Sequence, residues 1–142
     1  MQTWQLRAEG TMNTEDMSLG DFVQQILIQL EANQVHFRDE RPWHEFFYRF
    51  KSGPEQTGMP LFLKKLFFDW NGPYPRSQEL SEYLHGLHWT GCLAAPNPTY
   101  DSFTLRPDVR EIWLQKEVEP ELRQFLNVAG EAARRELVVH AS

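Results

Sequence analysis

The chain has 142 residues, a formal net charge of −6 and an aromatic fraction of 13%. This length is typical of one domain, and it buries enough surface to fold without a disulfide or a structural metal. A single cysteine, Cys92, excludes an internal disulfide framework, and the acidic balance disfavours non-specific binding to nucleic acid or anionic lipid. No stretch approaches the about 20 apolar residues of a membrane span, so we expect a cytoplasmic protein without membrane contact.

The N-terminal segment differs from the rest of the chain. Residues 1–17 carry no sustained apolar period, and Gly10, Asn13 and Asp16 are turn-forming residues. Terminal segments are commonly poorly ordered unless they dock on the domain. We therefore predict a leader, residues 1–17, that adds little to stability, and one globular domain, residues 18–142.

Two amphipathic helices are predicted at the start of this domain. Ser18 can cap a helix over residues 18–33, whose apolar positions repeat on one face. Pro42 suits the first turn of a second helix, which the sequence Ser52-Gly53-Pro54 ends. The inner face of the second helix is aromatic and consists of Trp43, Phe46, Phe47 and Phe50.

The middle of the chain predicts two further helices and a hairpin. Residues 61–70 suit a short helix with apolar Leu66 and Phe67, and residues 78–89 form a helix that Ser77 caps. Cys92–Ala94 is then predicted to pair antiparallel with Ser102–Leu105. The turn of this hairpin would contain Pro96, Asn97 and Pro98, because proline cannot donate to the strand ladder.

The C-terminal part predicts a helix that opens at Pro107 and a last helix over residues 120–138. The predicted fold class is therefore α+β, mostly α: a helical domain with one antiparallel β-hairpin. The periodicity places the following side chains in its core: Leu27, Phe46, Phe50, Leu66, Leu84, Leu87, Ile112, Phe125 and Leu126.

The order of elements in residues 60–107 carries an architectural signal. Leu80, Leu84 and Leu87 lie on the inner face of a helix that leads through Gly91-Cys92-Leu93 into the hairpin. Pro96–Tyr100 stands at its tip, and Phe103-Thr104-Leu105 returns. This order resembles the winged-helix family. The resemblance implies binding to DNA, with the helix before the wing entering the major groove and carrying basic or amide groups.

That helix has the wrong charge for a DNA-reading role. Its outward residues include Glu79 and Glu82, and residues 78–89 contain no lysine or arginine. Phosphate contacts dominate affinity for DNA and need positive or amide donors. The surface therefore favours a protein partner, and nucleic acid is the less expected one.

Histidines and acids gather in two places. The first cluster consists of His36, Asp39, Glu40, His44 and Glu45. Imidazole and carboxylate are common ligands of zinc and non-haem iron, and Glu40 and His44 have the spacing of a helical pair. Pro42 separates them, however, so we interpret the cluster as a polar loop and helix start. The second pair, His85 and His88, lacks a third ligand, so no metal site and no cofactor are assigned.

Catalytic signatures are not found in the sequence. It contains no phosphate-binding glycine loop, nucleophile elbow or dinucleotide fingerprint. The carboxylate pairs Glu79 and Glu82, and Glu119 and Glu121, fit solvated helix faces. Cys92 fits a small buried apolar residue.

Aromatic residues near turns can anchor a binding surface or cover the core. With the polar face of residues 78–89, they give the candidate partner-binding residues Trp70, Tyr74, Glu79, Glu82, His85, Trp89 and Tyr100. Our hypothesis is a non-enzymatic protein-interaction or regulatory module that binds a protein partner or forms a homodimer. The alternatives are a winged-helix DNA-binding regulator and a metal-dependent enzyme that uses histidines.

Overall fold

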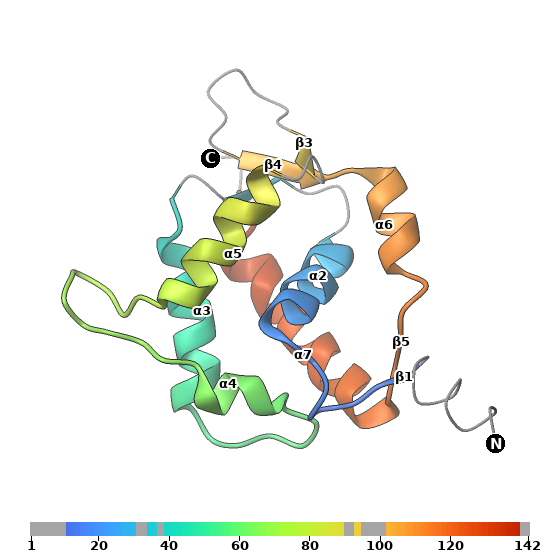
Figure 1. Ribbon diagram of the computed structural model, residues 1–142, viewed down its shortest axis with the longest axis horizontal. Coiled ribbons are helices and arrows are strands. Elements are labelled where there is room, and N and C mark those ends of the chain that lie inside the picture. The colour runs from blue at the N-terminus through green and yellow to red at the C-terminus, as the bar shows by residue number, and fades with distance from the viewer. Residues whose placement is uncertain (1–10, 31–33, 37–38, 90–92, 95–101, 140–142) are drawn as a thin grey trace.

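A computed structural model describes residues 11–30, 34–36, 39–89, 93–94 and 102–139, which are mostly helical. Figure 1 shows α2 and α7 side by side at the centre, with α3, α4 and α5 on one side and α6 on the other. The helices are α2 (Leu19–Leu30), α3 (Arg41–Ser52), α4 (Leu61–Lys65), α5 (Gln78–Trp89), α6 (Pro107–Trp113) and α7 (Pro120–Glu136). None of these helices has both the length and the apolar character that crossing a membrane requires.

The predicted starts of the helices α2 and α5 are confirmed by their serine caps. The Ser18 N–H donates to Asp21 Oδ2 over 3.1 Å, and the Asp21 N–H donates to Ser18 Oγ over the same distance. This reciprocal capping box satisfies two of the N–H groups that a helix start leaves without partners. Ser77 caps α5 through a single bond, in which its Oγ accepts the Leu80 N–H over 3.3 Å.

The core lies where α2, α3 and α7 meet. The Phe22 side chain of α2 is fully buried and contacts the Phe47 ring edge-on, with 5.4 Å between centroids. Phe22 also lies 6.2 Å from Phe125 of α7. Such aromatic contacts add about 0.5–1.5 kcal/mol each beyond the burial of their area. Of the side chains predicted to be buried, all but Phe50 and Ile112 are in the core.

Arginines from α6 and α7 donate hydrogen bonds to carbonyls at the C-terminal end of α2. The Arg110 Nε of α6 donates to the Ile28 carbonyl over 3.1 Å. The Arg134 Nη2 of α7 donates to the Gln29 carbonyl over 2.7 Å. Positive charge is favourable at a helix C-terminus, and α2 has no basic residue in its own last turn. The end of α2 is therefore stabilised by distant parts of the chain.

The strands are short and form two sheets. They are β1 (Thr11–Met12), β2 (Val35–His36), β3 (Leu93–Ala94), β4 (Ser102–Leu105) and β5 (Glu117–Val118). β3 pairs antiparallel with β4, Leu93 opposite Leu105, at the predicted position. The expectation of a single hairpin is nevertheless wrong, because β4 also pairs antiparallel with β2, and β1 pairs parallel with β5. The predicted turn, 96–98, and Cys92 lie outside the described residues.

Residues 11–17, which the sequence predicts as part of a leader, contact the rest of the described chain. Met17 exposes 2% of its surface and belongs to the core. β1 pairs with β5, and the Thr14 carbonyl accepts the Leu61 N–H over 2.9 Å. Two isolated methionines and a short strand give no period that could have revealed this docking.

We expect Met17→Ala to lower the free energy of unfolding by about 2–3 kcal/mol, because it removes a buried side chain from the core. Urea denaturation followed by circular dichroism measures this loss. Glu15→Ala is the control, since Glu15 is exposed two residues earlier. Equal stability of the two variants would show that the segment does not dock.

Ile112 was predicted to be buried, but it exposes 63% of its surface. The face of α6 that packs on the core is formed by Val109 and Trp113, four residues apart, together with Arg110, which reaches Ile28. Ile112 lies about 100° from the middle of that face. The sequence marked α6 as amphipathic but did not show which of its faces meets α2.

Candidate functional site

A buried polar network joins α3 to the start of α5. Its centre is His44, whose side chain is fully buried. The Ser77 N–H donates to His44 Nδ1 over 3.0 Å, and His44 Nε2 lies 3.2 Å from Glu40 Oε1. Because Nδ1 accepts a hydrogen bond, the proton of the neutral ring is on Nε2, which donates to Glu40. Glu40 and His44, which we interpreted from the sequence as part of a polar loop and helix start, are therefore in direct contact.

Glu40 also receives donors from α5. The Ser81 hydroxyl donates to Glu40 Oε1 over 2.8 Å, and Arg76 Nη2 donates to Ser81 Oγ over 3.0 Å. His85 Nε2 lies 2.9 Å from Glu40 Oε2, and 72% of the His85 side chain is exposed. Both oxygens of the Glu40 carboxylate are therefore in use, as a mostly buried charge requires.

This network has a structural role. Both ring nitrogens of His44 are in hydrogen bonds, and the Ser81 proton points to Glu40. Burial lowers the pKa of His44 below its usual value, against the opposing effects of the Glu40 hydrogen bond and charge. Within the described ranges, no three His, Cys, Asp or Glu side chains are grouped so that they could hold a metal ion.

We expect the protein to lose stability as the pH falls below about 6.5, the usual pKa of histidine. The folded state keeps His44 neutral, so the unfolded chain binds more protons, and stability is lost as the pH falls through the lowered pKa. Urea denaturation between pH 7.5 and 5 measures this dependence. His44→Gln should reduce it. An unchanged pH dependence in His44→Gln would contradict the assignment.

The loop before α5 is closed on itself and covers this network. The backbones of Asp69 and Arg76 exchange two hydrogen bonds of 2.9 and 3.0 Å. Within the loop, the Tyr74 ring lies 5.7 Å from the His44 ring, and the Arg41 guanidinium lies 5.4 Å from the centroid of Tyr74. Tyr74 is thus a half-buried cover over the network.

Two aromatic side chains of the segment after α4 are exposed, and we call them the aromatic surface. Phe67 exposes 70% of its surface and Trp70 exposes 61%. The chain leaves the helix at Leu66, which has an extended backbone, so the side chains of Leu66 and Phe67 point to opposite sides. Leu66 is buried, and Phe68 packs on the core. The Tyr48 ring lies 5.3 Å from both Phe68 and Trp70 in edge-on contacts.

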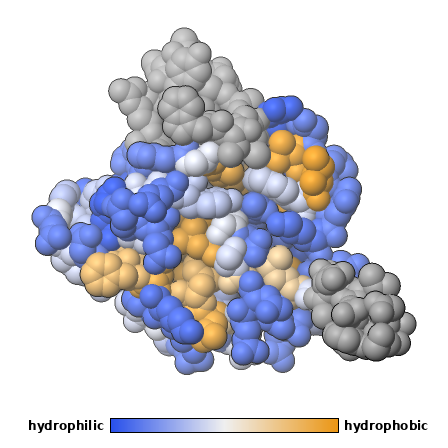
Figure 2. All heavy atoms as spheres, in the orientation of Figure 1, coloured by the Kyte–Doolittle hydropathy of each residue, from blue (hydrophilic) through white to orange (hydrophobic). Residues whose placement is uncertain are grey.

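An apolar cavity of about 280 Å³ lies between the starts of α2 and α5 and the helix α4, and we call it the α4–α5 cavity. Figure 2 shows hydrophobic side chains gathered on the viewed face over α4 and between α4 and α5, framed by hydrophilic ones. The cavity is lined by Ser18, Leu19, Phe62, Lys65, Leu66 and Glu79.

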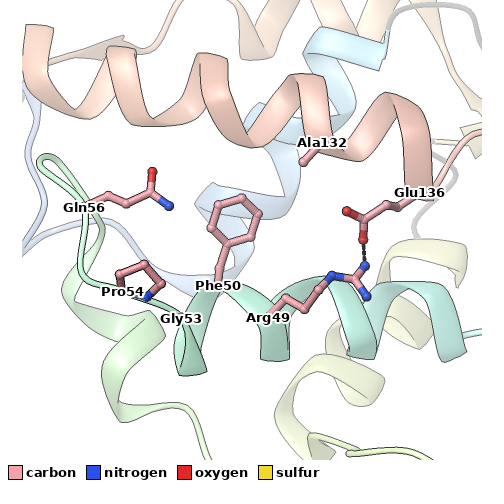
Figure 3. A pocket seen from close by; sticks show the side chains of 7 residues that line it. All are labelled: Arg49, Phe50, Gly53, Pro54, Gln56, Ala132 and Glu136. Carbon is pink, nitrogen blue, oxygen red and sulfur yellow. Dashed lines mark ion pairs between the residues drawn. The ribbon is translucent and has the colours of Figure 1, made fainter.

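A second cavity of about 190 Å³ lies between α3, the loop after it and α7. Figure 3 shows Phe50 between the two helices, with Gln56 and Pro54 towards one end. At the other end Arg49 forms an ion pair with Glu136. The two charges of this cavity are therefore paired with each other.

The predicted partner-binding residues that the structure describes do not lie together in one site. Trp70 belongs to the aromatic surface, whereas Tyr74 and His85 contact the network. Glu79 and Glu82 are exposed on α5, and Glu79 lines the α4–α5 cavity. The Trp89 side chain and Tyr100 lie outside the described residues. Sequence reasoning missed Phe67, which it placed on the apolar face of a longer helix.

No protein-family model matches the chain, and neither a curated protein nor a solved structure shows significant similarity to it.

Proposed function

We propose that the chain is a non-enzymatic protein-interaction module whose contact residues include Phe67 and Trp70. The observation that carries this proposal is the exposure of both rings on a segment whose neighbouring residues pack on the core. Leu66 and Phe68 anchor the segment in the core, and Trp70 packs edge-on against Tyr48. Aromatic anchors that are held in place before binding lose little entropy on binding, and such residues dominate the energy of many interfaces.

The polar network gives a second, independent argument for this proposal. Its histidine and carboxylate are occupied with holding α3 against α5 and the loop 69–76. The same contacts position the loop that carries Trp70. A network that places a surface loop fits a binding module better than a reaction centre.

A winged-helix-like arrangement of residues 60–107 belongs to the same proposal. It is supported by the way α5 leads into β3, which pairs antiparallel with β4. Against a DNA-reading role, Gln78, Glu79 and Glu82 are exposed on α5, which contains no lysine or arginine. Nearby arginines are used within the fold: Arg76 with Ser81, Arg106 with Asp108 and Arg110 with Ile28.

The proposal is tested by comparing two double variants with the wild-type protein. Phe67→Ser/Trp70→Ser removes the aromatic surface, and Ile112→Ser/Val128→Ser removes apolar residues that are about equally exposed on α6 and α7. Affinity purification from the native host with quantitative mass spectrometry detects a partner, and sedimentation velocity detects a second copy.

We expect the first variant to lose at least about 2 kcal/mol of binding energy, a more than tenfold weaker complex, while the control keeps its partner. A partner or a dimer that survives Phe67→Ser/Trp70→Ser unchanged would overturn the proposed surface.

A further inference from the structure

The floor of the α4–α5 cavity is part of the hydrophobic core. The Phe62 ring lies 5.6 Å from the ring of Phe22 and 6.4 Å from that of Phe47, and both of these rings are fully buried. Leu66, which also lines the cavity, exposes 3% of its surface. An apolar group that entered the cavity would thus meet side chains that are already held in place, which lowers the entropic cost of binding.

The α4–α5 cavity is large enough to admit an apolar side chain of a partner. Sites for drug-sized small molecules usually enclose roughly 300–1,000 Å³. The α4–α5 cavity, at about 280 Å³, lies below that range, and three of its six lining residues are Leu19, Phe62 and Leu66. A leucine, methionine or phenylalanine side chain from a protein partner is small enough to enter this cavity and matches its apolar lining.

The two rims of the cavity carry opposite charges. Glu79 lies on the α5 rim and Lys65 on the α4 rim. One turn beyond Glu79, Glu82 is also exposed, and its carboxylate accepts a hydrogen bond from Gln78 over 3.1 Å. In the part of the chain that the structure describes, none of these three charged groups is in an ion pair. The α5 rim is therefore a row of carboxylates next to an apolar opening.

We propose that the α4–α5 cavity docks a basic amphipathic segment of a partner protein. One large apolar side chain of that segment fills the cavity over Phe62, and a lysine or arginine beside it pairs with Glu79 and Glu82. The net charge of −6 attracts such a segment, and the unequal rims orient it with its basic residues towards α5. This inference rests on the proposed interaction role and names the chemistry of the partner.

The test is a nuclear magnetic resonance titration of the ¹⁵N-labelled full chain with two synthetic helical peptides. One peptide is built from leucine and lysine, and the other has glutamate in place of every lysine. We expect the basic peptide to shift the amide signals of Leu19, Phe62 and Leu66, and the acidic peptide to leave them unchanged.

Three single variants distinguish the effect of the rim charges on peptide binding from the effect of the net charge. Glu79→Gln should weaken the basic peptide about two- to fivefold, the effect of losing an exposed ion pair. Glu131→Gln alters the net charge equally at an exposed position on α7 and should have no such effect. Lys65→Gln removes the opposite charge at the same cavity and should not weaken the peptide.

Several outcomes would overturn the inference. They are no binding of the basic peptide, equal binding of the acidic one, equal weakening by Glu79→Gln and Glu131→Gln, and signal shifts confined to other surfaces. Loss of a partner in Phe67→Ser/Trp70→Ser without peptide binding would remove this inference alone. Peptide binding at the cavity with no effect of Phe67→Ser/Trp70→Ser would remove the aromatic surface and leave the cavity as the docking site.

Discussion

Replacing Gly58 with alanine should lower the free energy of unfolding by about 2–5 kcal/mol. Gly58 has a φ of +81°, and a Cβ there would lie 2.1 Å from the Glu121 carbonyl oxygen. A left-handed conformation costs a residue with a side chain about 1–2 kcal/mol. The overlap with the backbone of α7 adds about 1–3 kcal/mol, because the helix must shift.

Gly72→Ala is the matched control for this prediction. Gly72 also lies in a loop, and a Cβ there would meet no atom within 4 Å. Its stability should stay within about 0.5 kcal/mol of the wild-type protein. Urea denaturation of both variants gives the comparison, and a Gly58→Ala protein as stable as Gly72→Ala would show that the loop does not pack on α7.

Trp43→Ala should destabilise the protein by about 3–5 kcal/mol. The Trp43 side chain is fully buried, and its indole Nε1 donates to the His36 carbonyl over 2.6 Å. The variant therefore loses a large apolar group and also the bond that holds β2 against α3. Thermal and urea unfolding measure the loss.

Trp43→Phe separates these two contributions. It keeps an aromatic ring in the core and removes the indole N–H, so the His36 carbonyl loses this donor at a cost of about 1–3 kcal/mol. We expect a stability between those of Trp43→Ala and the wild-type protein. Two variants of equal stability would mean that packing of the ring contributes nothing, contrary to its complete burial.

Much of the helical structure could be predicted from local pattern. The aromatic face of α3 and the leucines of α5 repeat with the period of a helix, and Ser18 and Ser77 cap where their spacing indicates. Long amphipathic stretches of this kind carry their own signal. The short elements do not: β1 and β5 have two residues each, and their pairing depends on contacts across 105 intervening positions, Thr11 to Glu117.

The candidate site shows the same limit. Glu40 and His44 have a readable helical spacing, but the Ser81 hydroxyl that binds Glu40 lies 41 residues further along the chain. The α4–α5 cavity is built from three helices, and Glu79 was singled out only as part of a polar face. The exposure of Phe67 depends on α4 ending at Lys65, a boundary that an apolar run cannot locate.

Arg110 and Arg134 bind carbonyls at the C-terminal end of α2, so the order of synthesis determines when this end of the helix is stabilised. A ribosome releases Ile28 and Gln29 long before Arg110 and Arg134, which bind their carbonyls. One backbone hydrogen bond of β2 likewise forms only after Leu137 has been synthesised, because the Leu137 carbonyl accepts the His36 N–H over 2.9 Å. These hydrogen bonds of the early segments therefore form only after α6 and α7 have been synthesised. The part of the apolar face of α2 that packs on α7 stays exposed until α7 has emerged from the ribosome, and during that period it is open to chaperones and to aggregation.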